Sequence, residues 1–345
     1  KAAKPIIVNI VLLLILLALL EGLLLLLVRN PAILRHLPQR IGNMIGYIYT
    51  RERPTIQFEP DCSRHDPLLG YTLKPGSCTF GGREFTNRYD INSAGVRDRE
   101  AALDHPEIIV VGDSFAMGWG VNHEETFAAR LQQQTGRKVL NAAVSSYGTA
   151  REMMILQRIP TDHLKYLIIQ YCGNDLEENR SFYLHRNRLT AMTAEQYQAY
   201  QELYRESQHY YFGKYLRMKI GKRWDELEQK RQQAQTPPLD RDEVDLFLNA
   251  VQHSGLDIEK TTIIAFVMNG RNPDDNRDFP AALKRKLATG HYPSYLQNMI
   301  VLDFSDALRK EHFYTLDDHL NAAGHAVIAA GLAKAITGRQ GQNRQ

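Results

Sequence analysis

EIIVVGDS, residues 107–114, is a run of apolar and β-branched residues that ends in a Gly-Asp-Ser turn. A short apolar run of this kind, bounded by a turn, predicts a buried strand. Four further runs have the same character: KVLNA at 138–142, YLIIQYC at 166–172, TTIIAFVMN at 261–269 and MIVLDF at 299–304. Segments of helical periodicity separate these runs. Because strands alternate with helices, we expect an α/β domain with a parallel sheet of about five strands and right-handed crossovers.

The N-terminal segment is a candidate membrane span. Residues 6–28 are apolar except for Asn9, Glu21 and Gly22, and as a helix they are long enough to cross a hydrocarbon core of roughly 30 Å. The alternative, a cleaved signal peptide, would have an apolar region of only about 7–15 residues followed by a small-residue cleavage site. We therefore expect a single-pass anchor in the lipid bilayer. Glu21 is costly in lipid, so it is either a tolerated lone carboxyl or a contact with a partner membrane protein.

The charges and the cysteines give opposite indications of the side of the membrane on which the main domain lies. Three arginines at residues 29–40 follow the span, and by the positive-inside rule they would place the bulk of the chain in the cytoplasm. We discount this count because the sequence starts at Lys1 rather than methionine, so residues can precede it. Cys62 and Cys78 lie in a polar, Gly/Pro-rich stretch and predict a disulfide, the alternative being two unpaired surface thiols. A disulfide favours an oxidising compartment, so we expect an inner-membrane protein with its main domain in the periplasm.

A long polar insertion interrupts the strand–helix alternation at residues 176–240. Tyr197, Tyr200 and Tyr204 lie at i, i+3 and i+7 within it, so their rings share one helical face. We expect a helical cap that packs onto the domain through this face; the alternative is a platform on which a sugar stacks beside the site. The expected organisation is therefore an anchor at 1–29, a stalk with wrapping loops at 30–105, a catalytic domain at 106–338 that includes the cap, and a flexible tail at 339–345.

Composition excludes several classes of function. Lysine and arginine (42) nearly balance aspartate and glutamate (39), and the net charge of +3 gives no reason to expect a nucleic-acid partner. The sequence has no Cys/His cluster with zinc-ligand spacing, and neither a Walker-type nor a dinucleotide-binding glycine loop. We therefore expect chemistry that uses no metal and no cofactor.

Polar residues that directly follow predicted strands are the candidates for chemistry. Ser114 follows the first strand and Asn174 the third; in open α/β sheets ligands bind at the carboxyl ends of strands, so both should lie at one edge. A serine nucleophile needs a base, usually histidine, that a carboxylate orients. Among twelve histidines, His319 stands out because its segment, LDDHLN at 316–321, follows the last strand and precedes the final helix. His325 is expected to cap or pack, with the role of base as its alternative.

Together these residues resemble the SGNH (GDSL-like) hydrolase superfamily over residues 107–337. The resemblance implies a three-layer, flavodoxin-like, doubly wound fold, with Ser114 as nucleophile and His319 as general base. It also implies that the side-chain amide of Asn174 and the backbone N–H of Ser114 bind the oxyanion. Two upstream stretches are similar to lead-in segments of cell-envelope members: DPLLGYTLKPG at 66–76 and YDINSAGVR at 89–97.

Two glycine positions of the family pattern are occupied by other residues. Ser146 stands where the second block usually has its oxyanion-hole glycine, and Gly148 follows two positions later. A backbone N–H survives this change, so Ser146 is expected to be a further oxyanion donor. Cys172 stands at the glycine of the third block, Gly-x-Asn-Asp. We expect it to be a buried strand-end residue rather than a second nucleophile.

The carboxylate that orients His319 also departs from the common pattern. The usual Asp-x-x-His spacing would require aspartate at position 316, which is leucine. We choose Asp317 instead, because Asp-x-His spacing is similar to that of alginate-type O-acetyltransferases of the periplasm; Asp318 remains the alternative. The remaining residues expected to support the site are Gly112, Asp113, Gly148, Gly173 and Asp318.

The resemblance implies acyl transfer through an acyl-Ser114 intermediate. The expected substrates are ester-linked acyl groups, in the first place acetyl, on a cell-envelope glycan or glycolipid. Water would make the protein an esterase and a sugar hydroxyl an O-acyltransferase, and the residues leave both open. The alternative from another class is an assembly subunit of a membrane complex, whose SGNH-like chemistry has lapsed and which docks through the helix that carries Glu21.

Overall fold

The computed structural model describes residues 3–235 and 239–342. The chain divides into two compact units. The larger, here called the sheet unit, comprises Thr55–Glu202, Arg241–Tyr314 and Asp318–Gln345. The smaller, here called the helical unit, comprises Lys1–Pro54, Leu203–Asp240 and Thr315–Asp317. The predicted cap at 176–240 is thus shared between the two units.

The sheet unit is built on a five-stranded parallel sheet of order β6-β5-β7-β8-β9. Its strands are β5 (Ile108–Val111), β6 (Val139–Asn141), β7 (Tyr166–Tyr171), β8 (Thr262–Val267) and β9 (Ile300–Val301). The four residues of β5 and the six of β7 are buried, because a parallel sheet is covered on both faces. The strand order reverses beside β5, which makes the carboxyl end of this strand the topological switch point. The parallel α/β fold predicted from the sequence is confirmed.

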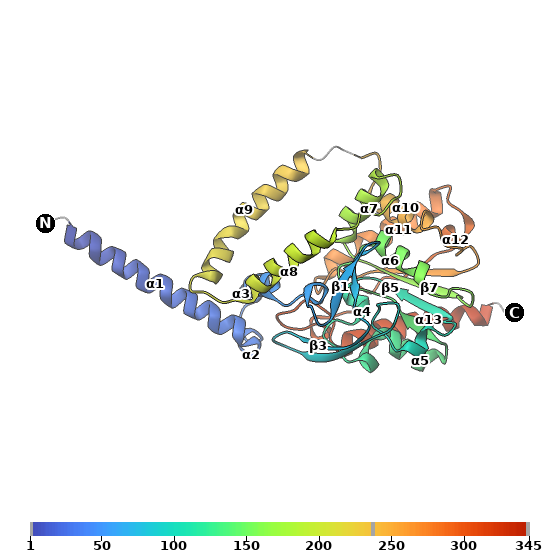
Figure 1. Ribbon diagram of the computed structural model, residues 1–345, viewed down its shortest axis with the longest axis horizontal. Helices are drawn as coiled ribbons and strands as arrows, with labels where there is room; N and C mark the ends of the chain where they lie inside the picture. The colour runs from blue at the N-terminus through green and yellow to red at the C-terminus, as the bar shows by residue number, and fades with distance from the viewer. Residues whose placement is uncertain (1–2, 236–238, 343–345) are drawn as a thin grey trace. The chain divides into compact units, whose positions relative to one another are not determined.

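Helices cover both faces of this sheet. Figure 1 shows α5 and α13 on one side and α6, α7 and α10 on the other, and each of these groups packs together. The helices of this unit are α4 (Ser114–Met117), α5 (Phe127–Thr135), α6 (Thr149–Ile155), α7 (Asp175–Leu184), α10 (Glu243–Gln252), α11 (Asp278–Thr289), α12 (Ser294–Gln297) and α13 (Ala322–Gln342), with the first part of α8 (Ala194–Gln208). Tyr197 on α8 is buried, and its hydroxyl donates a hydrogen bond to the carbonyl of Gln57 at 3.0 Å. The face of α8 that carries Tyr197 therefore packs onto the sheet unit.

Two antiparallel hairpins precede β5. They are β1 (Ser63–Asp66) with β2 (Gly70–Leu73), and β3 (Gly76–Gly81) with β4 (Thr86–Ile91). A disulfide between Cys62 and Cys78 joins the first hairpin to the second. The predicted disulfide is therefore confirmed.

The helical unit consists of α1 (Ala3–Arg29), α2 (Pro31–Leu34), α3 (Gln39–Glu52) and α9 (Lys214–Gln235), with the end of α8. Among the described residues, α1 is the one helix long and apolar enough to cross a membrane. Its last two turns pack through Leu24, Leu27 and Val28 into a small core with α3, α9 and Leu316. From Ile6 to Leu20, by contrast, every residue is exposed.

Glu21 has partners inside the helical unit. Its carboxylate is fully buried and accepts the backbone N–H groups of Tyr215 (3.1 Å) and Leu216 (2.9 Å) and the hydroxyl of Tyr210 (3.2 Å). The two N–H groups lie in the first turn of α9, where a helix leaves its donors unsatisfied. The carboxylate of Glu21 therefore caps α9, which is a role that neither sequence-based alternative for Glu21 included.

Candidate active site

Ser114 is the first residue of α4 and follows β5 across a tight turn. Asp113 caps α4, because its carboxylate accepts the backbone N–H of Phe115 at 2.9 Å. This cap fixes the backbone of the turn between β5 and α4. The side chain of Ser114 lies at the carboxyl edge of the sheet, and the residue is 9% exposed.

Gly112 is required by close contacts behind this turn. Its φ is 155°, and a Cβ at this position would lie 2.6 Å from both Cβ of Ala116 and Oε1 of Gln170. The same Gln170 oxygen, on β7, accepts the backbone N–H groups of Asp113 (3.1 Å) and Ala116 (3.2 Å). The turn that carries Ser114 is thus attached to the neighbouring strand through one amide.

The structure brings His319 to Ser114. Nε2 of His319 lies 2.6 Å from Oγ of Ser114, a hydrogen-bonding distance across 205 residues of sequence. The imidazole is buried between Trp119, whose ring stacks on it at 5.0 Å, and Phe115 at 4.6 Å. The carbonyl of His319 accepts the backbone N–H of Tyr314 at 3.0 Å, which fixes the main chain at this point. Sequence reasoning missed both aromatic residues, although both lie within five positions of Ser114.

The carboxylates near His319 differ in their surroundings. Oδ1 of Asp318 lies 3.8 Å from Nδ1 of His319, within ion-pair range but beyond a hydrogen bond. Asp317 is buried, accepts Nη1 of Arg53 at 2.8 Å and belongs to the helical unit. The choice of Asp317 over Asp318 as the orienting carboxylate stays a prediction.

The other two predicted oxyanion donors, Asn174 and Ser146, are exposed and lie in loops. Asn174 directly precedes α7, after β7. Ser146 follows β6 and has φ of +60°, the left-handed conformation that glycine adopts without strain. A residue with a Cβ in this conformation costs about 1–2 kcal/mol relative to the right-handed region. Oγ of Ser146 accepts Nε2 of Gln57 at 3.2 Å. The oxyanion roles of Asn174 and Ser146 stay predictions.

The loops that carry Ser146 and Asn174 are held together because acidic side chains of α7 cap the start of α6. Glu178 on α7 accepts the backbone N–H groups of Gly148 (3.2 Å) and Arg151 (3.0 Å) at the start of α6. Asp175 accepts the hydroxyl of Thr149 at 2.8 Å. A Cβ on Gly148 would lie 2.9 Å from Cβ of Glu178, so the approach of the two helices requires glycine. Gly173, beside Asn174, donates its N–H to Oδ1 of Asn269 at 2.6 Å.

Burial governs the protonation of the groups beneath the serine turn. It raises the pKa of Asp113, an effect that the N–H of Phe115 and the charge of His319 partly offset. Burial also raises the pKa of Cys172 well above its ordinary value, and the nearby charge of Asp113 adds to this effect. The thiol of Cys172 is therefore protonated and hydrogen-bonded to Asp113, which does not suit a second nucleophile.

The lead-in segment supports the loop that follows Ser114. The buried guanidinium of Arg97 donates to the carbonyls of Met117 (3.2 Å), Gly118 and Val121 (2.6 Å), and it lies 3.8 Å above the ring of Tyr89. These carbonyls form the end of α4 and the loop beyond it. Arg97 thereby supplies donors to the carbonyls of Met117 and Val121 and a second donor to that of Gly118, which also accepts the N–H of Val121 at 3.3 Å.

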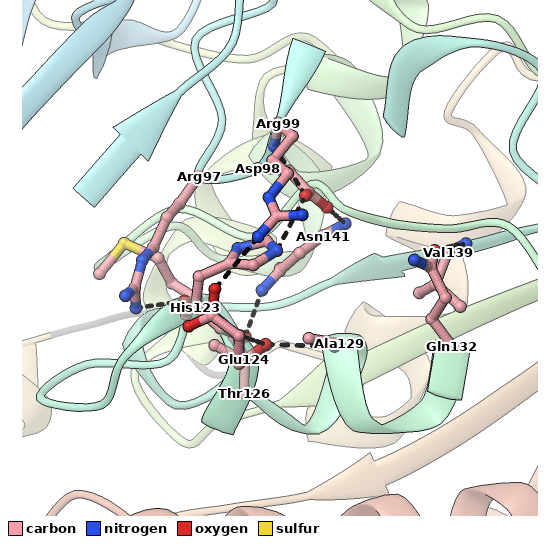
Figure 2. A network of polar contacts seen from close by, with 12 residues as sticks. Arg97, Asp98, Arg99, His123, Glu124, Thr126, Ala129, Gln132, Val139 and Asn141 are labelled. Atoms are coloured by element: carbon pink, nitrogen blue, oxygen red, sulfur yellow. Dashed lines mark hydrogen bonds and ion pairs between the residues drawn. The ribbon is translucent and has the colours of Figure 1, made fainter. Parts of the chain in front are cut away.

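Asp98 continues this support on the side of β6. Its carboxylate accepts the backbone N–H of Asn141 at 2.8 Å, and Nδ2 of Asn141 donates to the carbonyl of Ala116 at 2.9 Å. Figure 2 shows this network, with His123 directed at Asp98 over 3.6 Å. Burial raises the pKa of Asp98, and the N–H of Asn141 opposes that shift.

Two further histidine environments lie away from Ser114. Nδ1 of His325 accepts the N–H of Phe127 at the start of α5, and burial lowers the pKa of His325 to about 3, so this ring is neutral. His105, Asp162 and His163 form an exposed group whose donor atoms lie within 4.8 Å of one another and could hold a metal ion. This group precedes β5 and β7 and so lies at the opposite edge of the sheet from Ser114.

One family model matches the part of the chain that contains Ser114 and His319. The model of the GDSL-like lipase/acylhydrolase family matches residues 110–327, a range that includes Ser114 and His319. A solved structure of a G-D-S-L family protein from Desulfitobacterium hafniense DCB-2 is 12% identical, and the alignment covers 66% of this chain and 97% of that one at a TM-score of 0.40. The crystal structure of TesA is 13% identical with the same coverage and a TM-score of 0.35. A search of curated proteins found no match.

Proposed function

Because this chain belongs to the GDSL-like lipase/acylhydrolase family, we propose that it is a membrane-anchored serine esterase or O-acyltransferase that acts through an acyl-Ser114 intermediate. Family membership supports an esterase or acylhydrolase activity. The observation that carries the proposal is the 2.6 Å contact between Nε2 of His319 and Oγ of Ser114. Nucleophile and base within hydrogen-bonding distance are what serine acyl transfer requires.

In the first half-reaction, Oγ of Ser114 attacks the acyl carbonyl carbon while Nε2 of His319 takes the hydroxyl proton. The side-chain amide of Asn174 and the backbone N–H groups of Ser114 and Ser146 stabilise the resulting oxyanion. The tetrahedral intermediate then loses its alkoxide, which receives the proton from the imidazolium, and the acyl group stays on Ser114. Loss of one oxyanion donor typically costs about 10²–10³ in kcat.

In the second half-reaction, His319 deprotonates the acceptor as it attacks the acyl carbonyl carbon; the bond between this carbon and Oγ of Ser114 then breaks, and the imidazolium returns its proton to Oγ. Water as acceptor completes ester hydrolysis, whereas a sugar hydroxyl completes O-acylation. Trp119 and Phe115 hold the imidazole against Ser114 in both steps, because their rings cover its faces. This aromatic enclosure also restricts the access of bulk water to the base.

We place the protein in the inner membrane with its sheet unit in the periplasm, and we propose acetyl groups of an envelope glycan or glycolipid as substrate. The apolar length of α1 supports a single-pass anchor. The disulfide between Cys62 and Cys78 supports an oxidising compartment. An enzyme anchored on that side of the membrane meets envelope polymers rather than cytoplasmic esters.

A fluorophosphonate probe tests the proposal in membranes that contain the full-length chain. The proposal predicts covalent labelling of the wild type and none of Ser114→Ala, with Ser145→Ala, a nearby buried serine, as the labelled control. No labelling of a folded wild type would support the alternative of a lapsed assembly subunit. Acetyl analysis of surface polymers then separates the two activities: loss in Ser114→Ala cells indicates a transferase, and gain indicates an esterase.

A further inference from the structure

Helix α9 presents a second apolar face that the described part of the chain does not cover. Ile220, Trp224 and Leu227 are 66%, 71% and 59% exposed. They lie at i, i+4 and i+7, so they form one stripe along the helix. Tyr215 and Met218, on another face of α9, pack into the core of the helical unit. The exposed stripe, here called the α9 stripe, is therefore not needed to hold α9 in place.

The start of α9 is fixed to the apolar helix α1. The carboxylate of Glu21 accepts the N–H groups of Tyr215 and Leu216 in the first turn of α9. The guanidinium of Arg29 lies 5.9 Å above the ring of Tyr210, just before α9 begins. Within the helical unit, α9 then diverges from α1 instead of running alongside it (Figure 1).

The position of the contact between α1 and α9 along the membrane normal follows from the part of α1 that no other described residue covers. Residues 4–20 span about 25 Å as a helix, close to the roughly 30 Å of a hydrocarbon core. From Glu21 onwards, Leu24, Leu27 and Val28 are covered by the rest of the helical unit. The boundary between hydrocarbon and headgroups therefore falls within the last turns of α1, level with the start of α9.

The residues at and just before the start of α9 are of types that are common at a membrane interface. Residues 210–212 are Tyr-Tyr-Phe and all three are exposed, and aromatic residues concentrate at the headgroup level of bilayers. Lys214 is buried and pairs with Glu52 at 3.2 Å, and residues 215–231 of α9 include six lysines and arginines and three acidic residues, a net charge of +3. A helix of net positive charge with an exposed stripe of Trp, Leu and Ile suits the membrane interface and is attracted to anionic lipids.

We propose that α9 is an interfacial helix: the α9 stripe lies in the headgroup–acyl boundary of the same bilayer that α1 spans, and Glu21 fixes the depth of both helices. The inference rests on the proposed membrane anchoring of α1. The proposed partner of the α9 stripe is the lipid bilayer, because α9 starts beside Glu21, where the bare part of α1 ends, and because the net positive charge of α9 matches anionic headgroups. The chain thereby has two contacts with the membrane, one across it and one along it.

The two tryptophans of the sequence make this inference measurable. Trp119 is 3% exposed in the sheet unit, so Trp119→Phe leaves Trp224 as the one reporter. The full-length variant is placed in nanodiscs of phosphatidylcholine and phosphatidylglycerol whose acyl chains are brominated near the glycerol or near the methyl end. We expect the emission of Trp224 to be quenched by both lipids, more strongly by bromine near the glycerol end, and to be protected from iodide.

A second reporter separates this inference from the anchoring of α1. Leu14→Trp, combined with Trp119→Phe and Trp224→Phe, places one indole in the middle of the bare part of α1, and bromine near the methyl end should quench it. If this indole at position 14 is quenched while Trp224 is quenched by iodide and by neither brominated lipid, α1 is an anchor and the interfacial role of α9 is wrong. If bromine quenches neither reporter, the anchoring of α1 fails and the inference fails with it.

Discussion

Replacement of Arg97 by methionine should weaken both the fold and the catalytic activity. The guanidinium of Arg97 donates to the carbonyls of Met117, Gly118 and Val121 in the loop behind Ser114. Methionine has a similar length and no donors, so the carbonyls of Met117 and Val121 lose the guanidinium, while that of Gly118 keeps the N–H of Val121 at 3.3 Å. A buried acceptor left unpaired destabilises the fold by about 1–3 kcal/mol. Removal of the charge offsets part of this loss, because a buried guanidinium is itself unfavourable: desolvation lowers the pKa of Arg97. We expect the free energy of unfolding to fall by about 3 kcal/mol.

Arg99→Met is the matched control for this experiment. Arg99 is two positions away and exposed, and its guanidinium makes a surface ion pair with Glu124 at 3.1 Å. Such pairs contribute about 0–1 kcal/mol, so this variant should keep nearly the stability of the wild type. Arg97→Lys should lie between the two variants, because an ammonium keeps the charge but cannot reach three carbonyls as a planar fork does.

Urea unfolding of the detergent-solubilised chain, followed by circular dichroism, measures the stability of each variant. Hydrolysis of an aryl acetate under native conditions measures kcat. Displacement of the loop moves Ser114 relative to His319, so we expect kcat of Arg97→Met to fall while that of Arg99→Met does not. Equal stability and equal kcat for these two variants would refute the role assigned to Arg97.

Three further predictions follow from other parts of the sheet unit. Ser146→Gly should keep full activity and be about 1 kcal/mol more stable than Ser146→Ala, because both lose the hydroxyl but only alanine keeps a Cβ at φ of +60°; equal melting temperatures would contradict this. The pKa of His325 is about 3 in the native state and 6.5 when unfolded. As pH falls from about 6.5 towards 3, only the unfolded state gains a proton at this residue, so the free energy of unfolding should fall by about 1.4 kcal/mol per pH unit. In His325→Gln, the free energy of unfolding should depend less steeply on pH between pH 7 and pH 5. Cys62→Ser with Cys78→Ser should lower stability by about 3 kcal/mol, since the disulfide joins cysteines 16 positions apart, and in whole cells the wild-type thiols should react with maleimide only after reduction.

The strands and the serine turn were predictable because their signals are local. Apolar β-branched runs predicted all five strands of the central sheet, and the turn after β5 predicted the place of Ser114. The last strand was predicted as 299–304 but is only Ile300–Val301. The chain turns there because the carboxylate of Asp303 accepts the N–H of Ser305 at 2.9 Å, a contact that hydrophobicity does not encode.

The parts that were not predictable depend on contacts between distant residues. Glu21 caps a helix whose contacting N–H groups lie 194 and 195 positions later, so no local pattern connects the two. Arg97 was noted only as the end of a lead-in motif, since its three acceptors become neighbours only after the loop behind Ser114 has folded. The rings of Trp119 and Phe115 against His319 likewise depend on the return of the chain after β9.

Trapping of the acyl-enzyme tests the central claim most directly. The full-length chain is incubated with an aryl acetate, quenched in acid, digested and analysed by peptide mass spectrometry. We predict one acetyl group on the peptide that contains Ser114, its absence in His319→Ala, and no acetylation of the peptide that contains Cys172. Acetylation that persists on another residue in Ser114→Ala at the wild-type rate of turnover would contradict the proposed chemistry.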